Sequence, residues 1–423
     1  MPSETETDQP VDAVRLRRRR WGGLCRRFLL SLLVLVFSAK AGDWLLGVLA
    51  DSERRHLLRL EPSAEVVHSS DEFDYVFRTN PLGFRGRHID VSARVTDQRL
   101  VVLGDSFVAG VGVADDEVFT EIIAEKVADR SVDVVNLGRA GTSTVRESTI
   151  YEQVGRAYRG DVVMLVYYLG NDLAEVVDEK TDEEWMGWRP RGLLRRLAFG
   201  WCPNMYMELA IWKRRARALD GEGPRSEAEV VGWIRREALS SRFDPAVAEK
   251  RYRALPRAIR DKAQSGGLPA YRYLQACLDP DRLRNSVDPD AAFEARAWDR
   301  TRRHLEKIRT AVVSDGGRFV LAVIPDASQV SSEAHEFQQQ LGFSVHEHWL
   351  EEKGRTLELL KEWSSETGTA LLNLAPAFRD HGDPTFHIED GHCNAAGHRV
   401  IAASVLAWPP IRESLGLDRE TSP

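Results

Sequence analysis

The sequence predicts a three-layer α/β/α sandwich, with a parallel sheet of about five strands and a mostly helical insertion. Two observations support this fold class. Short β-branched runs alternate with stretches of helical pattern, and the runs are apolar on successive residues rather than on every second one. Such runs indicate strands that helices cover on both faces, as in parallel sheets. The expected strands are 100–103, 132–137, 161–169, 318–325 and 370–374.

Stretches with helical spacing of apolar residues follow these strands in order. The expected helices are 118–128, 148–159, 292–315, a segment around 347–366, and a last one after Asn394. The alternating pattern occupies 98–172 and 292–410, which we interpret as one domain that an insertion divides. Residues 411–423 then form a C-terminal tail.

The N-terminus has the pattern of a bacterial export signal. Residues 1–27 form a basic tail, and the apolar segment 28–39 follows its arginines. Continued through two charged residues, 28–50 is just long enough to cross a bilayer, which needs roughly 20 apolar residues. We expect a signal-anchor with everything after residue 50 on the extracytoplasmic side.

Two alternatives to this anchor stay open. Ala39-Lys40-Ala41 offers a small-x-small cleavage site, which would release a periplasmic or secreted protein. A buried helix of a soluble protein is the other alternative.

Residues 51–97 connect the N-terminal segment to the α/β domain, and Asn80-Pro81 with Gly83 predicts a turn there. Residues 173–291 contain no convincing strand and read as a helical insertion after the third strand. Ligands bind at the carboxyl ends of parallel strands, so the insertion is a candidate lid. The alternative is an appendage whose tryptophans pack together: Trp185, Trp188, Trp201, Trp212 and Trp233.

Within the insertion, tryptophan is a weak indication of sugar stacking. Residues 191–201 could instead rest on a membrane surface, because leucines and arginines alternate there at helical spacing.

Charge and cysteine content exclude several classes of protein. The formal net charge is -7, so no general electrostatic attraction to nucleic acid is expected. The four cysteines lack metal-ligand spacing, and neither a metal nor an organic cofactor is expected. A bond between Cys202 and Cys277 stays open if both lie outside the cytoplasm.

Four patches that can carry chemistry lie where strands are expected to end. Ser106 completes a GDS motif after the first strand, and NLGRAGTST (136–144) follows the second. Asn171 lies in a GND motif after the third strand, and Asp390 and His392 lie two residues apart near the C-terminus. Taken singly, the serine is more often a helix cap and the others are more often turn residues.

Together these residues suit nucleophilic catalysis. A serine hydroxyl is a weak nucleophile until a base takes its proton, and a third group must hold that base in one tautomer. The Asp390 carboxylate can accept a hydrogen bond from Nδ1 of His392, which leaves Nε2 as the proton acceptor. Ser106 would lie at a helix N-terminus, beside free backbone N–H groups.

The order Ser, Gly, Asn and Asp-x-His resembles the SGNH hydrolase superfamily (the GDSL esterase/lipase family), in its exported bacterial type with an N-terminal membrane segment. The resemblance covers 99–172 and 293–408. It implies a flavodoxin-like fold, with Ser106 as the nucleophile, His392 as the base and Asp390 as its orienting partner.

The resemblance also implies an oxyanion hole made of the backbone N–H groups of Ser106 and Gly141 and the Asn171 side chain. Gly138 is a competing glycine, although Gly141 has the family's spacing from Asn136. The acid often lies three residues before the histidine in the family, so Glu389 competes with Asp390 for that role.

We therefore expect an exported serine esterase that cleaves a carboxylic, O-acyl ester through an acyl-serine. Its expected substrates are small-molecule, lipid or carbohydrate esters, and its expected partner is the membrane that anchors it. An O-acyltransferase acting on envelope or extracellular carbohydrate would use the same residues. A third hypothesis, from a different functional class, is a binding domain without catalytic activity.

Overall fold

The computed structural model describes residues 26–48, 62–179, 193–206, 209 and 225–418, apart from positions 28, 32, 92, 93, 95, 352 and 353. The chain divides into two compact units. The smaller contains Met1–Arg54 and Trp188–Asp220, and the larger contains Arg55–Gly187 and Gly221–Pro423.

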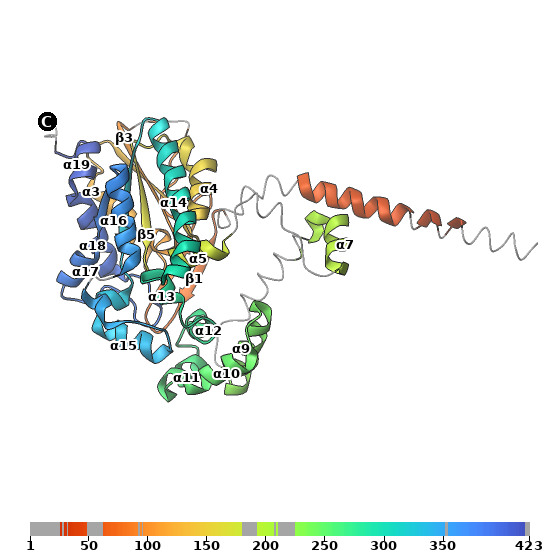
Figure 1. Ribbon diagram of the computed structural model, residues 1–423. Helices are drawn as coiled ribbons and strands as arrows, with labels where there is room; N and C mark the ends of the chain where they lie inside the picture. The colour runs from red at the N-terminus through yellow and green to blue at the C-terminus, as the bar shows by residue number, and fades with distance from the viewer. Residues whose placement is uncertain are drawn as a thin grey trace, which may run out of the picture. The chain divides into compact units, whose positions relative to one another are not determined.

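The larger unit is built around a five-stranded parallel sheet with the strand order β4-β3-β5-β6-β7 (Figure 1). The chain places β4 on one side of β3 and then β5, β6 and β7 on the other side, so β3 lies at a topological switch point. In open α/β sheets, ligands bind in the crevice beside such a point. Every strand lies within two residues of its expected range, so the predicted sheet is confirmed. The strands are β3 (Gln98–Gly104), β4 (Val132–Gly138), β5 (Val162–Tyr168), β6 (Arg318–Ile324) and β7 (Ala370–Asn373).

Successive residues of each strand enter two different hydrophobic cores. In β3, Leu100 and Val102 face one core, and Val101 and Leu103 face the other. This explains why the strands are apolar on successive residues. Helices cover the first core with α3 (Phe119–Lys126), α17 (Ala375–Asp380), α18 (Ala395–Ala407) and α19 (Pro409–Ser414). Helices α4 (Thr144–Gln153), α14 (Ala291–Ser314) and α16 (Arg355–Thr367) cover the second.

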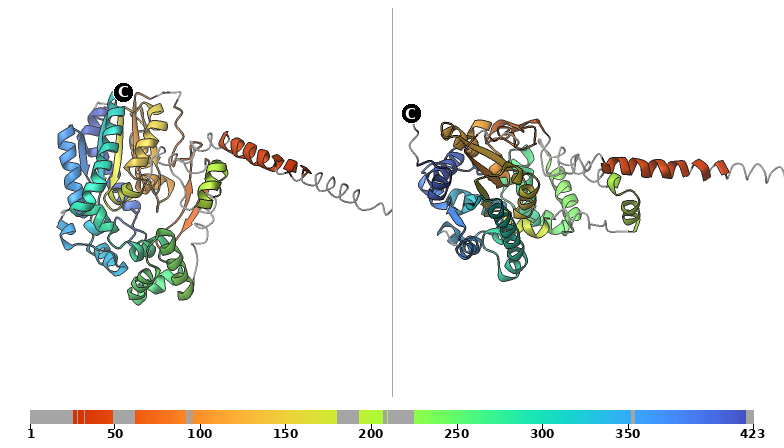
Figure 2. Two further views of the ribbon diagram at one scale, coloured as in Figure 1. Left: turned by 45° about the vertical axis from the view of Figure 1, so that its right-hand side comes forward. Right: turned by 90° about the horizontal axis from the view of Figure 1, so that it is seen from above.

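The part of the insertion that belongs to this unit is helical, as predicted, and packs around a third hydrophobic core, to which Leu341, Phe343 and Trp349 from outside the insertion also belong. Residues 227–278 group together at the lower end of the domain in Figure 1 and in the left view of Figure 2. Trp233 packs on this core, whereas Trp185, Trp188 and Trp212 lie outside the described residues. The helices are α5 (Asp172–Asp178), α9 (Glu227–Ser241), α10 (Pro245–Ala254), α11 (Arg257–Ser265), α12 (Ala270–Leu278) and α13 (Arg282–Val287).

The connecting segment contains an antiparallel hairpin that the sequence analysis did not predict, β1 (Glu65–Ser69) with β2 (Asp74–Arg78). The hydroxyl of Tyr75 in β2 accepts a hydrogen bond from the N–H of Gly112 (3.0 Å), which attaches the hairpin to the loop beyond β3. The turn predicted at residues 80–83 is confirmed, since the Asn80 side chain accepts a hydrogen bond from the N–H of Leu82 (2.9 Å).

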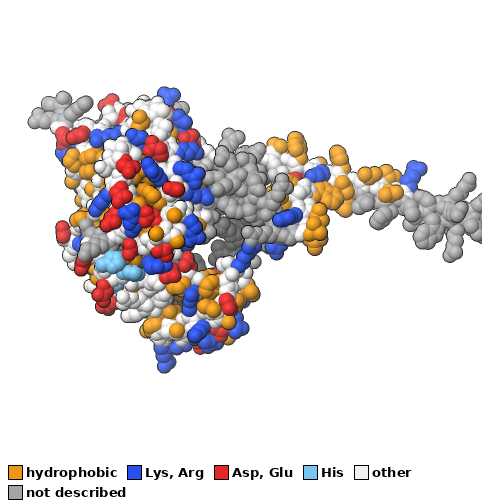
Figure 3. Space-filling model, in the orientation of Figure 1, with side chains coloured by type: hydrophobic (Ala, Val, Ile, Leu, Met, Phe, Trp, Pro, Cys, Tyr) orange, Lys and Arg blue, Asp and Glu red, His pale blue; other side chains and the backbone are white. Residues whose placement is uncertain are grey.

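The smaller unit contains the helix Leu29–Val48 and the amphipathic helix α7 (Leu193–Trp201). By length and composition the first is apolar enough to cross a membrane, with a mean hydropathy of 1.7 over 20 residues. Hydrophobic side chains mixed with basic ones cover much of this unit's surface in Figure 3.

Three further features concern expectations from the sequence. Helix α15 (Ser332–Leu341) was not predicted. The domain extends beyond residue 410 into the expected tail, because Ile411 and Leu415 are buried in the first core. Cys202, in the smaller unit, and Cys277, in the larger, are both free thiols.

The competing glycine at the end of β4 is needed for packing. A Cβ at Gly138 would lie 2.3 Å from the main-chain nitrogen of Ala109 and 2.5 Å from the main-chain carbon of Val108. We expect Gly138→Ala to lower the free energy of unfolding by about 3 kcal/mol, because backbone cannot give way cheaply. Chemical denaturation of the full chain measures this loss.

The matched control is Gly316→Ala. Gly316 has a φ of +85°, but a Cβ there would meet no atom within 4 Å. Backbone strain alone should cost about 1 kcal/mol at this position. Equal losses in the two variants would contradict the packing role of Gly138.

Candidate active site

Ser106 lies at the start of the short helix α2 (Ser106–Ala109), directly after β3. The chain leaves the strand in a sharp turn at Gly104. A residue with a side chain would not fit there, because its Cβ would lie 2.4 Å from the Val108 side chain. Asp105 caps the helix by accepting a hydrogen bond from the N–H of Phe107 (2.9 Å). The serine is therefore held at a strand end on the switch-point side of the sheet, as its motif predicted.

His392 reaches Ser106 from a tight loop near the C-terminus. Its Nε2 lies 2.8 Å from the Ser106 Oγ, and its Nδ1 is hydrogen-bonded to Oδ1 of Asp390. The loop closes on itself, because the N–H of His387 donates to the carbonyl oxygen of His392 (2.8 Å). Gly391 occupies the left-handed region (φ +94°), which a residue with a side chain rarely adopts. The structure thus brings together the three residues that the sequence analysis singled out for a triad.

The electrostatics of the pair suit a base and its orienting carboxylate. Burial lowers the pKa of His392, but the charge and hydrogen bond of Asp390 outweigh burial and hold it above the ordinary 6.5. Burial raises the pKa of Asp390, yet His392 and Arg272 hold it well below its usual range. Asp390 is therefore ionised whenever His392 is neutral enough to take a proton.

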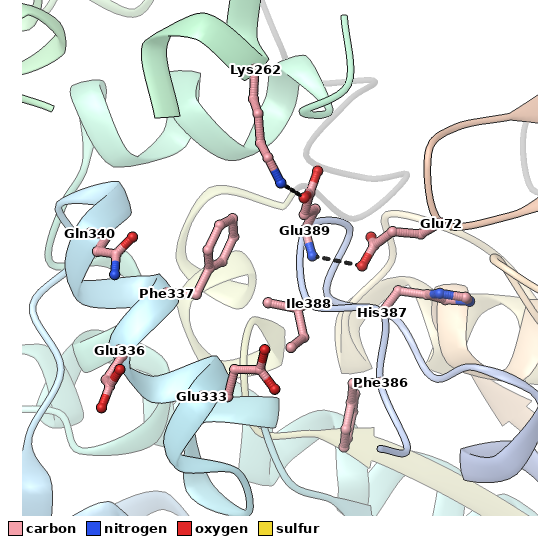
Figure 4. Close-up of a pocket in the computed structure, with 10 residues that line it drawn as sticks. All are labelled: Glu72, Lys262, Glu333, Glu336, Phe337, Gln340, Phe386, His387, Ile388 and Glu389. Carbon is pink, nitrogen blue, oxygen red and sulfur yellow. Dashed lines mark hydrogen bonds and ion pairs between the residues drawn. The ribbon is translucent and has the colours of Figure 1, made fainter. Parts of the chain in front are cut away.

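Glu389, the competing acid, has a different partner from Asp390. Its carboxylate forms an ion pair with Lys262 of α11 instead (Figure 4). The neighbouring His387 has a structural contact of its own, between its Nε2 and the carbonyl oxygen of Gly112 (3.0 Å).

The loop that carries Asp390 is held from two sides by groups that the sequence analysis did not identify. Glu72, in the turn of the β1–β2 hairpin, accepts hydrogen bonds from the N–H groups of Glu389 (3.0 Å) and Asp390 (2.8 Å). From α12 of the insertion, the Tyr271 hydroxyl donates to Oδ2 of Asp390 (3.1 Å) and to its carbonyl oxygen. Arg272 donates to the carbonyl oxygen of Glu389 (3.1 Å).

Asn171 is the best-placed side-chain donor beside the serine. It borders the same cavity as Ser106 and His392, and its Nδ2 makes only long contacts, to Asp105 (3.5 Å) and to Glu175 (3.4 Å). Such a loosely held amide can turn toward an oxyanion without giving up a strong hydrogen bond.

The two candidate glycines differ in their surroundings. Gly141 has a φ of +71° and open space where a Cβ would lie, whereas Gly138 is packed against α2. Space is therefore open beside Gly141, but Gly141 is not among the residues that line the cavity bordered by Ser106 and Asn171.

Several buried carboxyl groups lie close to the serine. Burial raises the pKa of Asp105 to about 6 and that of Glu175 to about 7. Burial and the neighbouring Asp105 also raise the pKa of Glu147 well above its usual range. The neutral form of these groups, which burial favours, would not oppose an oxyanion that develops nearby, whereas their ionised form would.

Two hollows adjoin the catalytic loop. The smaller, of about 90 Å³, contains Ser106 and His392 and is bordered by Tyr271 and Arg272 of the insertion. The larger, of about 560 Å³, lies along the residues just before Asp390 (Figure 4). Four glutamates and one lysine line it, together with apolar side chains: Glu72, Glu333, Glu336, Glu389, Lys262, Phe337, Phe386 and Ile388.

One group of side chains among the described residues has the spacing of metal ligands. The ligand atoms of Asp288, His346 and His348 lie within 4.8 Å of one another. This group includes none of the triad residues, and Asp288 is already hydrogen-bonded to His348 (3.0 Å).

No protein-family model and no curated protein matches this sequence. Several solved structures resemble the chain at low identity. An α/β hydrolase from the metagenome of Lake Arreo is 12% identical (TM-score 0.35), and the match covers 77% of this chain and 98% of that one. A lipolytic protein of the G-D-S-L family from Veillonella parvula is 11% identical (TM-score 0.33), covering 74% and 98% of the two chains.

An acetylxylan esterase from Geobacillus stearothermophilus is 10% identical (TM-score 0.36), covering 78% of this chain and all of that one (100%). Because identity and TM-score are low in each case, these likenesses carry no conclusion about the family, activity or substrate of this chain.

The two acidic residues of the loop give a sharp test of the site. Asp390→Asn should lower kcat for a small aryl acetate by about 10⁴, because an amide does not hold the imidazole in the required tautomer. Glu389→Gln removes only the ion pair with Lys262 and should change kcat less than about tenfold. Steady-state kinetics measure both, and the reverse order would assign the acid to Glu389.

Tyr271→Phe tests whether the insertion takes part in positioning Asp390. Burial and the nearby Asp390 raise the pKa of Tyr271 well above its usual range, so its hydroxyl stays a donor. Its loss should lower kcat about tenfold with KM nearly unchanged. It should also move the acidic limb of the pH–rate profile upward, because a less stabilised Asp390 favours the imidazolium.

The matched control is Tyr273→Phe, on the same helix but in the core of the insertion. A general loosening of α12 would lower activity in both variants and leave the acidic limb where it is. That result would remove Tyr271 from the positioning of Asp390.

Proposed function

We propose that this chain is an exported serine esterase of the SGNH type that cleaves a carboxylic ester through an acyl-serine intermediate. The observation that carries the proposal is the hydrogen-bonded chain from Ser106 Oγ through His392 to Asp390, with 2.8 Å between Oγ and Nε2. A nucleophile, a base in reach of its proton and a third group that orients the base are the requirements for nucleophilic acyl transfer.

In the first half of the reaction, Ser106 Oγ attacks the ester carbonyl carbon while Nε2 of His392 takes the hydroxyl proton. Ionised Asp390 stabilises the imidazolium that results. The negative charge that develops on the carbonyl oxygen is met by the N–H groups of Ser106 and Gly141 and by the Asn171 amide. Donors aimed at this oxygen commonly contribute about 10² to 10³ each in rate.

In the second half, the imidazolium returns its proton to the departing alkoxide, which leaves as the alcohol. Water then enters, His392 takes its proton, and hydroxide attacks the acyl-serine. Collapse of the second tetrahedral intermediate releases the acid and restores the serine proton from His392. Each step uses only residues of this chain and water.

The pH dependence follows from the direction of the His392 pKa. The base must be neutral to accept the serine proton, and its pKa is raised above 6.5. Activity should therefore be full at alkaline pH and should fall as pH drops through this raised pKa.

Two features support a small ester as the substrate of an exported enzyme. The hollow at Ser106 is small, about 90 Å³, and polar side chains including Asn171, Arg272 and Asp390 border it. Export is supported by the apolar helix Leu29–Val48 near the N-terminus, preceded by an arginine-rich tail. On this assignment the α/β domain faces the extracytoplasmic side.

The direct test is covalent labelling of Ser106. A fluorophosphonate probe should form an adduct on Ser106, located by mass spectrometry of the digested protein, and His392→Ala should slow its formation strongly. Ser106→Ala should abolish the adduct and lower kcat/KM for an aryl acetate by about 10⁴ or more. Full activity of Ser106→Ala would end the proposal.

A further inference from the structure

Helix α7 exposes an apolar face that the described residues of the smaller unit do not cover. The side chains of Leu193, Leu194, Leu197 and Trp201 are 74%, 81%, 60% and 49% exposed, and no residue of α7 is buried. At 3.6 residues per turn these four fall within an arc of about 100°, and Arg195 and Arg196 fall outside it. This pattern is typical of helices that lie in the surface of a bilayer.

The same compact unit joins α7 to the N-terminal apolar helix. Directly after α7, the Asn204 amide donates to the carbonyl oxygen (2.9 Å) and the carboxylate (3.3 Å) of Asp43. The N–H of Met205 donates to the same carboxylate (2.9 Å). Lys40 donates to the carbonyl oxygen of Trp201. These contacts fix the end of α7 beside residues 40–43.

Residues 40–43 are also where the apolar helix becomes polar. The uninterrupted run 28–39 spans only about 18 Å at 1.5 Å per residue, against about 30 Å of hydrocarbon. Charged groups inside a bilayer are costly unless neighbouring groups hydrogen-bond them or they reach the interface. Asp43, only 5% exposed, has both carboxylate oxygens satisfied by the segment after α7.

We propose that α7 lies in the outer interface of the membrane that the N-terminal helix enters. Its leucines and Trp201 reach the acyl chains, and Arg195 and Arg196 contact anionic lipid headgroups. The segment after α7 hydrogen-bonds the Asp43 carboxylate. The part of the helix Leu29–Val48 that lies in the bilayer therefore extends past residue 39, where the uninterrupted apolar run ends. The partner of this face is thus a lipid bilayer with anionic headgroups. The contact with the apolar helix favours a bilayer, and the two arginines favour anionic headgroups.

The experiment uses the full chain, reconstituted in vesicles of phosphatidylcholine and phosphatidylglycerol with a photoactivatable diazirine in the acyl chains. After illumination, mass spectrometry of the digest locates the lipid adducts. We expect adducts in both 29–39 and 193–201. Residues 227–241 of α9 are the internal control, because Leu239 is 67% exposed there but belongs to the larger unit.

A matched pair of variants tests the apolar face itself. Leu194→Glu combined with Leu197→Glu should lower labelling of 193–201 about tenfold and leave 29–39 labelled, whereas Leu239→Glu should change neither. Vesicles of phosphatidylcholine alone should label 193–201 less than the anionic vesicles, because the arginines then lose their partners.

Three outcomes would overturn the proposal. The first is labelling of 29–39 without labelling of 193–201, as expected if another protein surface covers α7. The second is labelling of 193–201 that the glutamates do not change. The third is labelling of neither segment. Hydrolysis of an aryl acetate by the same vesicles tests the esterase separately, so the two proposals can fail independently.

Discussion

The hydrogen bond between the Asp390 carboxylate and the His392 imidazole is the constraint on which the geometry of the candidate site depends. The loop of six residues between Phe386 and Cys393 would be free to move if only its own backbone held it. The bridge between these two residues closes the loop at its base, and Gly391 allows the turn at its tip. Because the imidazole can bond the carboxylate and the serine together only in one orientation, small movements of this loop would separate Ser106 from its base.

Groups far apart in the sequence supply the rest of that support. The Glu72 carboxylate holds the two N–H groups of the loop, and Tyr271 and Arg272 of the insertion hold its carbonyl oxygens. The insertion was expected to be either a lid or an appendage, but its α12 contacts the triad acid directly. It therefore takes part in building the site as well as in bordering the hollow above it, and it cannot be treated as a separable cover.

The strands, and the position of Ser106 at a strand end, could be predicted from the sequence because each depends on local pattern. Two-sided burial shows as successive apolar residues, and Ser106, Asn171 and Asp390-x-His392 lie in short motifs at strand ends. The choice of Asp390 over Glu389 as the partner of His392 needed the fold, because it depends on where Lys262 of α11 reaches. Glu72 and Tyr271 had no sequence signal, since a single glutamate in a hairpin turn or a tyrosine on a helix is ordinary. Helix α15 was not predicted. Ser331 caps it by accepting a hydrogen bond from the N–H of Ala334 (3.2 Å), and a serine at this position is a helix start signal that the sequence analysis did not use.

The distance along the chain between Ser106 and His392 has a consequence for biosynthesis. If the chain is an exported esterase, as proposed, Ser106 crosses the membrane well before His392, which follows it by 286 residues. The Glu72 contacts form only after that, because their partners, Glu389 and Asp390, belong to the same later segment. Hydrolytic competence would thus arise only once residues 389–392 have crossed, and a chain that stalled earlier would carry an inert serine rather than a prematurely active enzyme.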